Sequence, residues 1–149
     1  MDALSVVGGG IAGLTLAACL DPERFQVTVH ERRNEPPSVE TSLAMWPEAQ
    51  QALNEVGILP AVRAAGSVFG GMALRDGSGA VLFTARAPGI IGVSRADLLR
   101  LLDAAVPAPV ARAYGPVASL PRSGLVVGAD GVHSIVRRRL WGERSRARL

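Results

Sequence analysis

The stretch ALSVVGGGIAGLTLAACL, residues 3–20, decides the fold of this chain. It opens as a short apolar run that ends in glycine, as a buried parallel strand does, and it continues after the three glycines with apolar residues over a helical length. A run without charges of this length also raises the possibility of a membrane span, but three consecutive glycines are unfavourable inside a spanning helix. The stretch therefore predicts a buried strand, a tight turn and a helix.

The segment FQVTVHE, residues 25–31, places apolar residues at every second position and predicts a second strand. Strand, helix and strand in this order form a βαβ unit. Gly8, Gly10 and Gly13 have the spacing G-x-G-x-x-G in the turn of this unit, and Glu31 ends the second strand. The pattern predicts an α/β domain that binds a dinucleotide.

Each residue of the glycine turn has a physical role in such a site. Gly8 makes the tight turn, Gly10 lets the backbone approach the pyrophosphate, and Gly13 lets the helix and the strand pack closely. The first helical turn, which contains Ile11 and Ala12, presents free N–H groups and the positive end of the helix dipole to the phosphates. These five residues are the expected pyrophosphate site.

Glu31 is expected to accept hydrogen bonds from the hydroxyls of the adenosine ribose. A carboxylate at this position repels a 2′-phosphate, which favours FAD or NAD over NADP. The alternative is a glycine-rich turn beside a solvated Glu31 that binds nothing.

The rest of the chain alternates helical and strand patterns, with hairpin chemistry in the middle. The turn sequence Asp76-Gly77-Ser78-Gly79 separates two apolar runs, and Ser94 is a candidate N-cap with Asp97 at the third helical position. Expected elements after the βαβ unit are a helix over 46–57 that ends at Gly57, a hairpin over 67–85, a helix over 94–106, strands over 116–120 and 124–130, and a helix over 133–140.

Composition excludes several functions. The net charge is +3, but the excess is confined to residues 137–149, and a basic face with stacking aromatics is missing, which argues against nucleic-acid binding. Cys19 is the only cysteine and there are two histidines, so neither a disulfide nor a metal centre is expected. No membrane interaction is expected, and a single cysteine fits a cytoplasmic protein.

Four stretches together resemble the FAD-dependent monooxygenases of the p-hydroxybenzoate hydroxylase type. They are VVGGGIAGLTLA, VTVHERR, SRADLLRLL and LVVGADGVHSIVR, in that order along the chain. The last is the most specific to this group. The resemblance implies a Rossmann-like FAD/NAD(P)-binding domain of the glutathione-reductase type, with a parallel sheet and an added β-hairpin.

The resemblance also implies site residues. Gly8, Gly10 and Gly13 with Glu31 would hold the ADP half of FAD. Arg32 and Arg95 would lie near the adenosine and the pyrophosphate. Asp130, beside Gly131, would contact the ribityl chain, and this turn would help to position the nicotinamide cofactor. The alternative for Asp130 is a helix N-cap or turn residue.

The activity that the resemblance implies is hydroxylation of a small, often aromatic, substrate with FAD, NADH or NADPH, and O2. No catalytic residue is assigned, because the cofactor performs the chemistry. The alternative is a non-catalytic dinucleotide-binding remnant or an NAD-binding module.

Members of this family are much longer than this chain. We therefore expect one truncated FAD-binding domain over 1–149, in which the hairpin over 67–92 belongs to the beginning of a substrate domain and residues 137–149 form a basic tail. The other half of such an enzyme would be missing or separately encoded, in which case it would be a partner of this chain.

Overall fold

A computed structural model describes residues 1–34, 41–121 and 124–142 of the chain. The chain divides into two units, of which one comprises Met1–Pro36 with Leu102–Leu149 and the other comprises Pro37–Leu101. The boundary falls inside helix α4 (Arg95–Ala105).

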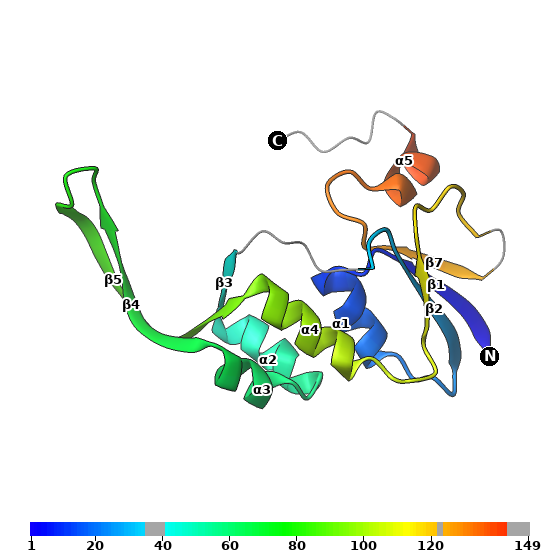
Figure 1. Ribbon diagram of the computed structural model, residues 1–149, viewed down its shortest axis with the longest axis horizontal. Helices are drawn as coiled ribbons and strands as arrows, with labels where there is room; N and C mark the ends of the chain where they lie inside the picture. The colour runs from blue at the N-terminus through cyan, green and yellow to red at the C-terminus, as the bar shows by residue number, and fades with distance from the viewer. Residues whose placement is uncertain (35–40, 122–123, 143–149) are drawn as a thin grey trace. The chain divides into compact units, whose positions relative to one another are not determined.

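The first unit is built on a parallel sheet. Among its described residues the strands have the order β6-β2-β1-β7, and all three neighbouring pairs are parallel. Helix α1 packs on β1 and β2, and helix α5 packs on β7 (Figure 1). The bounds are β1 (Asp2–Val7), α1 (Ile11–Cys19), β2 (Phe25–Glu31), β6 (Ala111–Tyr114), β7 (Leu125–Gly128) and α5 (Ile135–Trp141). The predicted parallel α/β sheet is thus confirmed.

The register of this sheet aligns the ends of its strands. Val6 of β1 pairs with Val29 on one side and with Val127 on the other, and Val6 and Val29 are fully buried. Because the strands are parallel, the turns that leave β1 and β7 and the last residue of β2 lie at the same edge. Ligands bind at this carboxyl edge in open α/β sheets, at the point where the strand order reverses.

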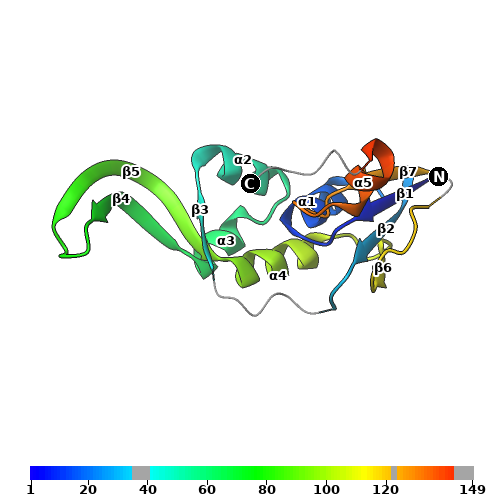
Figure 2. The same ribbon diagram turned by 90° about the horizontal axis from the view of Figure 1, so that it is seen from above.

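The second unit contains an antiparallel sheet in the order β3-β5-β4, with two short helices. Its elements are β3 (Ser42–Met45), α2 (Pro47–Glu55), α3 (Leu59–Ala65), β4 (Ser67–Arg75) and β5 (Val81–Ser94). Strands β4 and β5 form a long curved two-stranded ribbon that projects beyond α2 and α3 (Figure 2). The predicted hairpin is present, and its second strand continues to Ser94.

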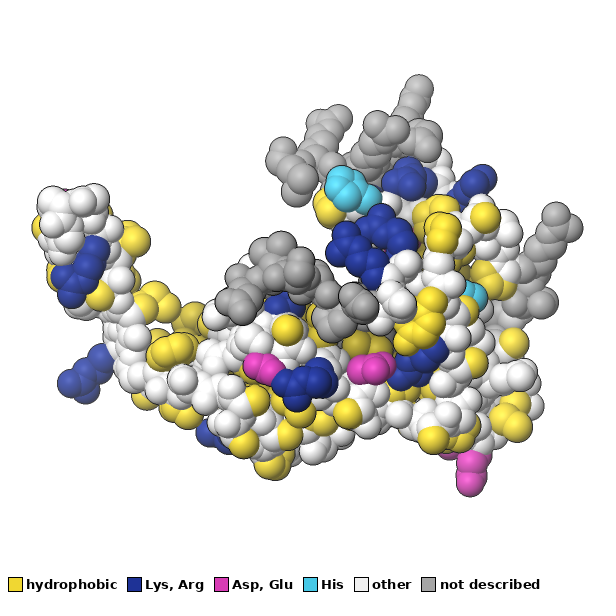
Figure 3. Space-filling model, in the orientation of Figure 1, with side chains coloured by type: hydrophobic (Ala, Val, Ile, Leu, Met, Phe, Trp, Pro, Cys, Tyr) yellow, Lys and Arg dark blue, Asp and Glu magenta, His cyan; other side chains and the backbone are white. Residues whose placement is uncertain are grey.

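The distal part of the β4–β5 ribbon has two different faces. Leu74 pairs with Phe83, whereas the neighbouring pair of Ala73 with Thr84 belongs to the opposite face because side chains alternate along a strand. Leu74 and Phe83 are both more than half exposed, and hydrophobic side chains are visible along the ribbon in Figure 3. One face of the ribbon is therefore apolar and open.

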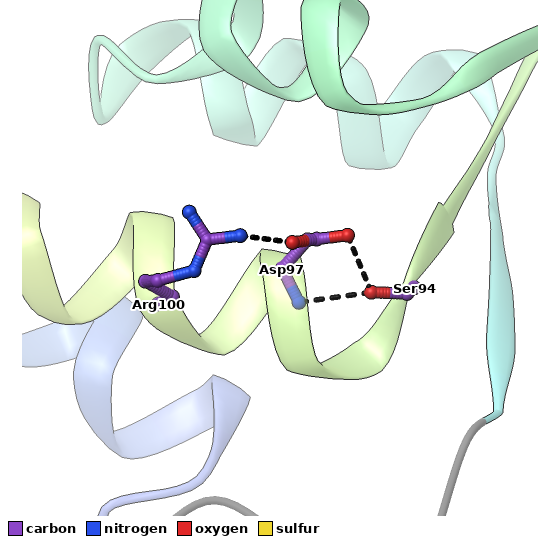
Figure 4. A network of polar contacts seen from close by, with 3 residues as sticks. All are labelled: Ser94, Asp97 and Arg100. Carbon is purple, nitrogen blue, oxygen red and sulfur yellow. Dashed lines mark hydrogen bonds and ion pairs between the residues drawn. The ribbon is translucent and has the colours of Figure 1, made fainter.

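Helix α4 begins with the N-cap that the sequence predicts. The Ser94 hydroxyl accepts a hydrogen bond from the Asp97 backbone N–H at 3.0 Å and donates to the Asp97 carboxylate at 2.7 Å. Arg100 forms an ion pair with the same carboxylate (Figure 4). Helix α2 ends as predicted too, since Gly57 follows its C-cap with a φ of 85°.

Several expectations about local structure were wrong or incomplete. Residues 116–120 are not a strand, and the strand in this region is β6, which pairs with β2. Gly115, with a φ of 122°, ends β6, and Pro116 has no N–H to give to a ladder. Strand β3 and helix α3 were not predicted.

Candidate functional site

The candidate site lies in the first unit, where the turns after β1 and β7 meet. The Gly8 N–H donates to the His30 carbonyl of β2 at 2.8 Å, and the Ala129 N–H donates to the Val7 carbonyl of β1 at 2.7 Å. These two bonds continue the parallel ladders beyond the strands. They bring the glycine turn and the Gly128–Gly131 turn to one edge although the two turns are far apart in sequence.

Two glycines of the fingerprint are required by close contacts within the protein. A Cβ on Gly8 would lie 2.3 Å from the Ala129 carbonyl oxygen, and the φ of Gly8 is 111°. A Cβ on Gly13 would lie 1.8 Å from the Gly8 carbonyl oxygen. Gly8 thus lets the two turns touch backbone to backbone, and Gly13 lets α1 approach the turn after β1.

Gly10 differs from both of these glycines. A Cβ there would meet no atom within 4 Å, and its φ of −81° and ψ of −172° are open to any residue. Neither packing nor backbone strain within the described residues explains the missing side chain. An open place at the start of a helix, kept clear by a glycine, fits a ligand that approaches the backbone closely.

The N-terminus of α1 offers donors at this open place. No side chain among the described residues caps it, and the first intrahelical bond at this end is that from the Leu14 N–H to the Gly10 carbonyl, at 2.9 Å. The N–H groups of Ile11 and Ala12 precede this bond and have no intrahelical partner. Donors of this kind, with the positive end of a helix dipole, suit the two phosphates of a dinucleotide.

Glu31 is bound to the glycine turn itself. Its Oε2 accepts from the Gly9 N–H at 2.7 Å, and its Oε1 accepts from the Arg33 N–H at 3.0 Å. Each carboxylate oxygen has room for a second hydrogen bond, so the half-buried side chain can still accept from ribose hydroxyls. The geometry fits the ribose of an adenine nucleotide beside the pyrophosphate place.

Gly9 is a site residue that the sequence analysis missed. A Cβ on Gly9 would lie 2.9 Å from the Cβ of Glu31, so any other residue would push the carboxylate away. The spacing G-x-G-x-x-G allows any residue at position 9. Glycine is necessary there because of the Glu31 side chain across the turn. Three adjacent glycines were the one signal in the sequence.

Asp130 has the geometry of a helix cap. Its Oδ1 accepts from the Ser134 hydroxyl at 2.5 Å, and its Oδ2 accepts from the Ile135 N–H at 2.6 Å and more weakly from the Val136 N–H at 3.3 Å. Asp130 and Gly131 lie in the turn that touches Gly8, so they are at the site. These bonds are those of a turn residue that caps the helix from outside, since the N-cap residue of α5 is Ser134.

The two arginines expected near the adenosine and pyrophosphate lie apart in the chain. Arg32 follows Glu31 directly and is exposed. Arg95 belongs to the second unit, where it is the first residue of α4, is exposed, and donates its backbone N–H to the Thr41 carbonyl at 2.8 Å. The structure therefore brings eight of the ten expected residues to one edge of the sheet, which are all of them except the two arginines. Arg32 is the neighbour of one of the eight, Glu31.

The described residues contain neither a membrane-spanning helix nor a cluster of metal ligands. No helix there is long and apolar enough to span a bilayer. No group of three or more His, Cys, Asp or Glu side chains there is placed to hold a metal ion.

Comparison with known proteins agrees with the geometry. Residues 6–40 match the family model of the NAD(P)-binding Rossmann-like domain. The chain is 30% identical to the FAD-dependent monooxygenase paxM of Penicillium paxilli over 96% of its own length, which is 35% of paxM. It is 31% identical to the 3-amino-4-hydroxybenzoate 2-monooxygenase PtmB3 of Streptomyces platensis, over 96% of this chain and 43% of that protein.

The fold also matches that of a solved oxygenase structure. The structure of 2-methyl-3-hydroxypyridine-5-carboxylic acid oxygenase superposes with a TM-score of 0.82 at 23% identity, over 95% of this chain and 42% of that one. The chain thus spans less than half the length of these relatives. We conclude that the chain is similar, over 96% of its own length, to a part of FAD-dependent monooxygenases that are more than twice as long.

Proposed function

We propose that the first unit of this chain binds the ADP half of FAD at the carboxyl edge of its parallel sheet. The observation that supports this most directly is Gly10, whose missing side chain leaves an open place beside the uncapped N-terminus of α1. The N–H groups of Ile11 and Ala12 would donate to the pyrophosphate. Glu31, already oriented by Gly9, would accept from the ribose hydroxyls.

The whole protein is proposed to act as a flavin-dependent monooxygenase on a small, possibly aromatic molecule, with NADH or NADPH as co-substrate. When bound, FAD supplies the redox chemistry of hydroxylation. The residues of this chain would hold the cofactor by its nucleotide end, where backbone N–H groups would donate to the negatively charged pyrophosphate. The similarity to the monooxygenases paxM and PtmB3 supports this reaction class.

The β4–β5 ribbon would belong to the beginning of a substrate domain, and its open apolar face would be covered there. The remainder of the enzyme, which the relatives possess, would come from a separately encoded polypeptide or from the same gene. Arg95 would approach the pyrophosphate from α4. The single cysteine supports a cytoplasmic location.

A plain NAD-binding module is the second candidate, because the family model that matches residues 6–40 is described by NAD(P) binding. Glu31 disfavours the 2′-phosphate of NADP in either case. Both candidates bind an ADP group. They differ in the other half of the dinucleotide, which carries a flavin in FAD and a nicotinamide in NAD.

Calorimetric titration of the purified chain with ADP, FAD, NAD and NADP tests the proposal. We expect ADP and FAD to bind and NADP to bind more weakly than NAD. In Gly10→Ala the added methyl group would occupy the phosphate place, and ADP affinity should fall by about tenfold or more, a change of about 1.4 kcal/mol. Gly77→Ala is the matched control, since a Cβ on Gly77 also meets nothing within 4 Å.

The outcomes separate the candidates. Binding of NAD with no gain from the flavin half of FAD would favour the NAD-binding module. Failure of all four ligands to bind would refute the assignment of the edge as a nucleotide site. Equal ADP affinity in Gly10→Ala and the unsubstituted chain would remove Gly10 from the site.

A further inference from the structure

Ser134 connects the turn at the candidate site to the helix behind it. Its hydroxyl donates to Asp130 Oδ1 at 2.5 Å and accepts from the Arg137 N–H at 3.0 Å. Ser134 is only 7% exposed, and within the described residues it and Gln50 are the buried residues with polar side chains. Both hydrogen-bonding functions of this buried hydroxyl are therefore used.

Together Ser134 and Asp130 occupy the donors of the first turn of α5. Asp130 Oδ2 accepts from the Ile135 and Val136 N–H groups, and Ser134 Oγ accepts from the next one. The Asp130 charge is thus directed at the positive end of the α5 dipole. Helix α1 has no such cap, so of these two helix ends only that of α1 has free donors for phosphates.

The turn that Asp130 belongs to is itself pressed against the glycine turn. The Ala129 N–H donates to the Val7 carbonyl, and Gly8 comes so close that its Cβ would lie 2.8 Å from the Asp130 nitrogen. On the other side, a Cβ on Gly128 would lie 2.9 Å from the Cβ of Val136 in α5. A displacement of the α5 end would therefore be transmitted to Gly8 through the contact of the Val136 side chain with Gly128 and the backbone contacts of Ala129 and Asp130 with Gly8.

We propose that Ser134 is a positioning residue of the nucleotide site, which acts by orienting Asp130 so that α5 holds the Gly128–Gly131 turn against Gly8. This role rests on the proposed function, because it concerns the same site. Asp130 then serves the site through the backbone of its turn. Ser134 itself touches no nucleotide.

Substitution of Ser134 tests this role. Ser134→Ala removes the donor to Asp130, and we expect ADP affinity to fall roughly tenfold, as for the loss of a hydrogen bond to a charged group. Ser134→Thr keeps the hydroxyl and should restore the affinity. Val62→Ala is a control for lost stability, because Val62 is fully buried in α3 of the other unit. It should lower thermal stability and leave ADP affinity unchanged.

A double substitution tests whether Ser134 acts through Asp130. In an Asp130→Ala background, Ser134→Ala should cause little further loss of ADP affinity, because its partner is already gone. Additive losses would show that Ser134 acts independently and would overturn the proposal. So would unchanged ADP affinity in Ser134→Ala, or a loss that Ser134→Thr does not restore.

Hydrogen exchange distinguishes this proposal from the nucleotide site itself. In the ligand-free chain, Ser134→Ala should increase amide exchange at Ala129, whose N–H bonds the Val7 carbonyl, more than Val62→Ala does. If the chain binds no ADP but this exchange increases, the proposed function fails, while the role of Ser134 in holding the Gly128–Gly131 turn is supported. If ADP binds and the exchange at Ala129 does not change, that role of Ser134 is refuted.

Discussion

Gly8 and Ala129 are in backbone contact across the sheet edge, so close that a Cβ on Gly8 would lie 2.3 Å from the Ala129 carbonyl oxygen. This contact joins the two motifs that are most informative in the sequence. It shows that the glycine turn and the Asp-Gly turn form one structure. Gly8 is therefore a folding requirement, whereas no contact within the described residues requires a glycine at the position of Gly10.

Gly8→Ala should destabilise the first unit strongly. The substitution combines a positive φ with a clash against backbone, and each of these effects costs about 1–3 kcal/mol. Gly10→Ala, two residues away, should leave the free energy of unfolding of the ligand-free chain unchanged within about 0.5 kcal/mol. Urea unfolding followed by circular dichroism compares the two variants. Equal stability of both variants would show that the close approach of Gly8 is not maintained in solution.

Glu31 should determine the preference between nucleotides with and without a 2′-phosphate. Glu31→Gln retains an acceptor for one backbone donor and removes the negative charge. We expect ADP to bind less tightly and 2′-phospho-ADP to gain relative to ADP, because the repulsion of the added phosphate is lost. Competition titrations of the two nucleotides measure this ratio. An unchanged ratio would mean that Glu31 does not face the ribose.

Sequence patterns were sufficient to predict structure where a residue's conformation depends on residues close to it in the chain. The strand, turn and helix around Gly8 could be predicted from local periodicity, and the Ser94 cap from its spacing to Asp97. Strand β6 was misplaced because Ala111–Tyr114 has little hydrophobicity of its own and is defined by pairing with β2. Local periodicity contains no information about that pairing.

The candidate site shows the same limit. Gly9 was missed because its constraint is the Glu31 side chain across the turn. The role of Asp130 was predicted as two alternatives, and the spacing to Ser134 and Ile135 could have favoured the cap. Whether a carboxylate caps a helix or faces a ligand depends on the direction of the turn, which sequence alone does not contain.

The N-cap of α4 should make a measurable contribution to stability. Ser94→Ala removes the acceptor of the Asp97 N–H and the donor to the Asp97 carboxylate, and should cost about 0.5–2 kcal/mol. Ser94→Asp retains an acceptor for that N–H but faces Asp97 with a like charge, so it should recover only part of the loss. Thermal unfolding of both variants provides the test. An unchanged thermal stability of Ser94→Ala would show that water replaces this cap.

Gln50 should be essential to the second unit. Its Nε2 donates to the Met45 carbonyl at 2.9 Å and to the Gly89 carbonyl at 2.6 Å, while its Oε1 accepts from Arg63 at 2.8 Å. Gln50→Leu, which preserves most of the volume, leaves these partners unsatisfied and should cost about 1–3 kcal/mol. Gln51→Leu on the exposed face of α2 is the matched control. Equal unfolding free energies of the two variants would contradict this role.

The tip of the β4–β5 ribbon should loosen in acid. The pKa of Asp76 lies below its ordinary value because the Ser78 hydroxyl, the Ser78 N–H and the Ala80 N–H donate to its carboxylate. A lowered folded pKa stabilises the turn above the unfolded pKa, and this stabilisation is lost as the pH falls through the folded value, below 3.8. Backbone amide shifts of Ser78 and Ala80 should therefore titrate below pH 3.8. Asp76→Asn should abolish that titration, and a midpoint at or above the ordinary value would show that the turn does not hold the charged carboxylate.

The open face of the ribbon should determine how well the chain stays in solution. Leu74 and Phe83 form a cross-strand pair that is more than half exposed, and exposed apolar patches promote association. Replacing both by threonine keeps β-propensity and should lower dye binding and light scattering of concentrated samples. The pair Ala73 and Thr84 supplies the control, since Ala73→Thr changes the opposite face of the same ribbon. If both substitutions reduced scattering equally, association would depend on the free edge of β4 and not on the apolar face.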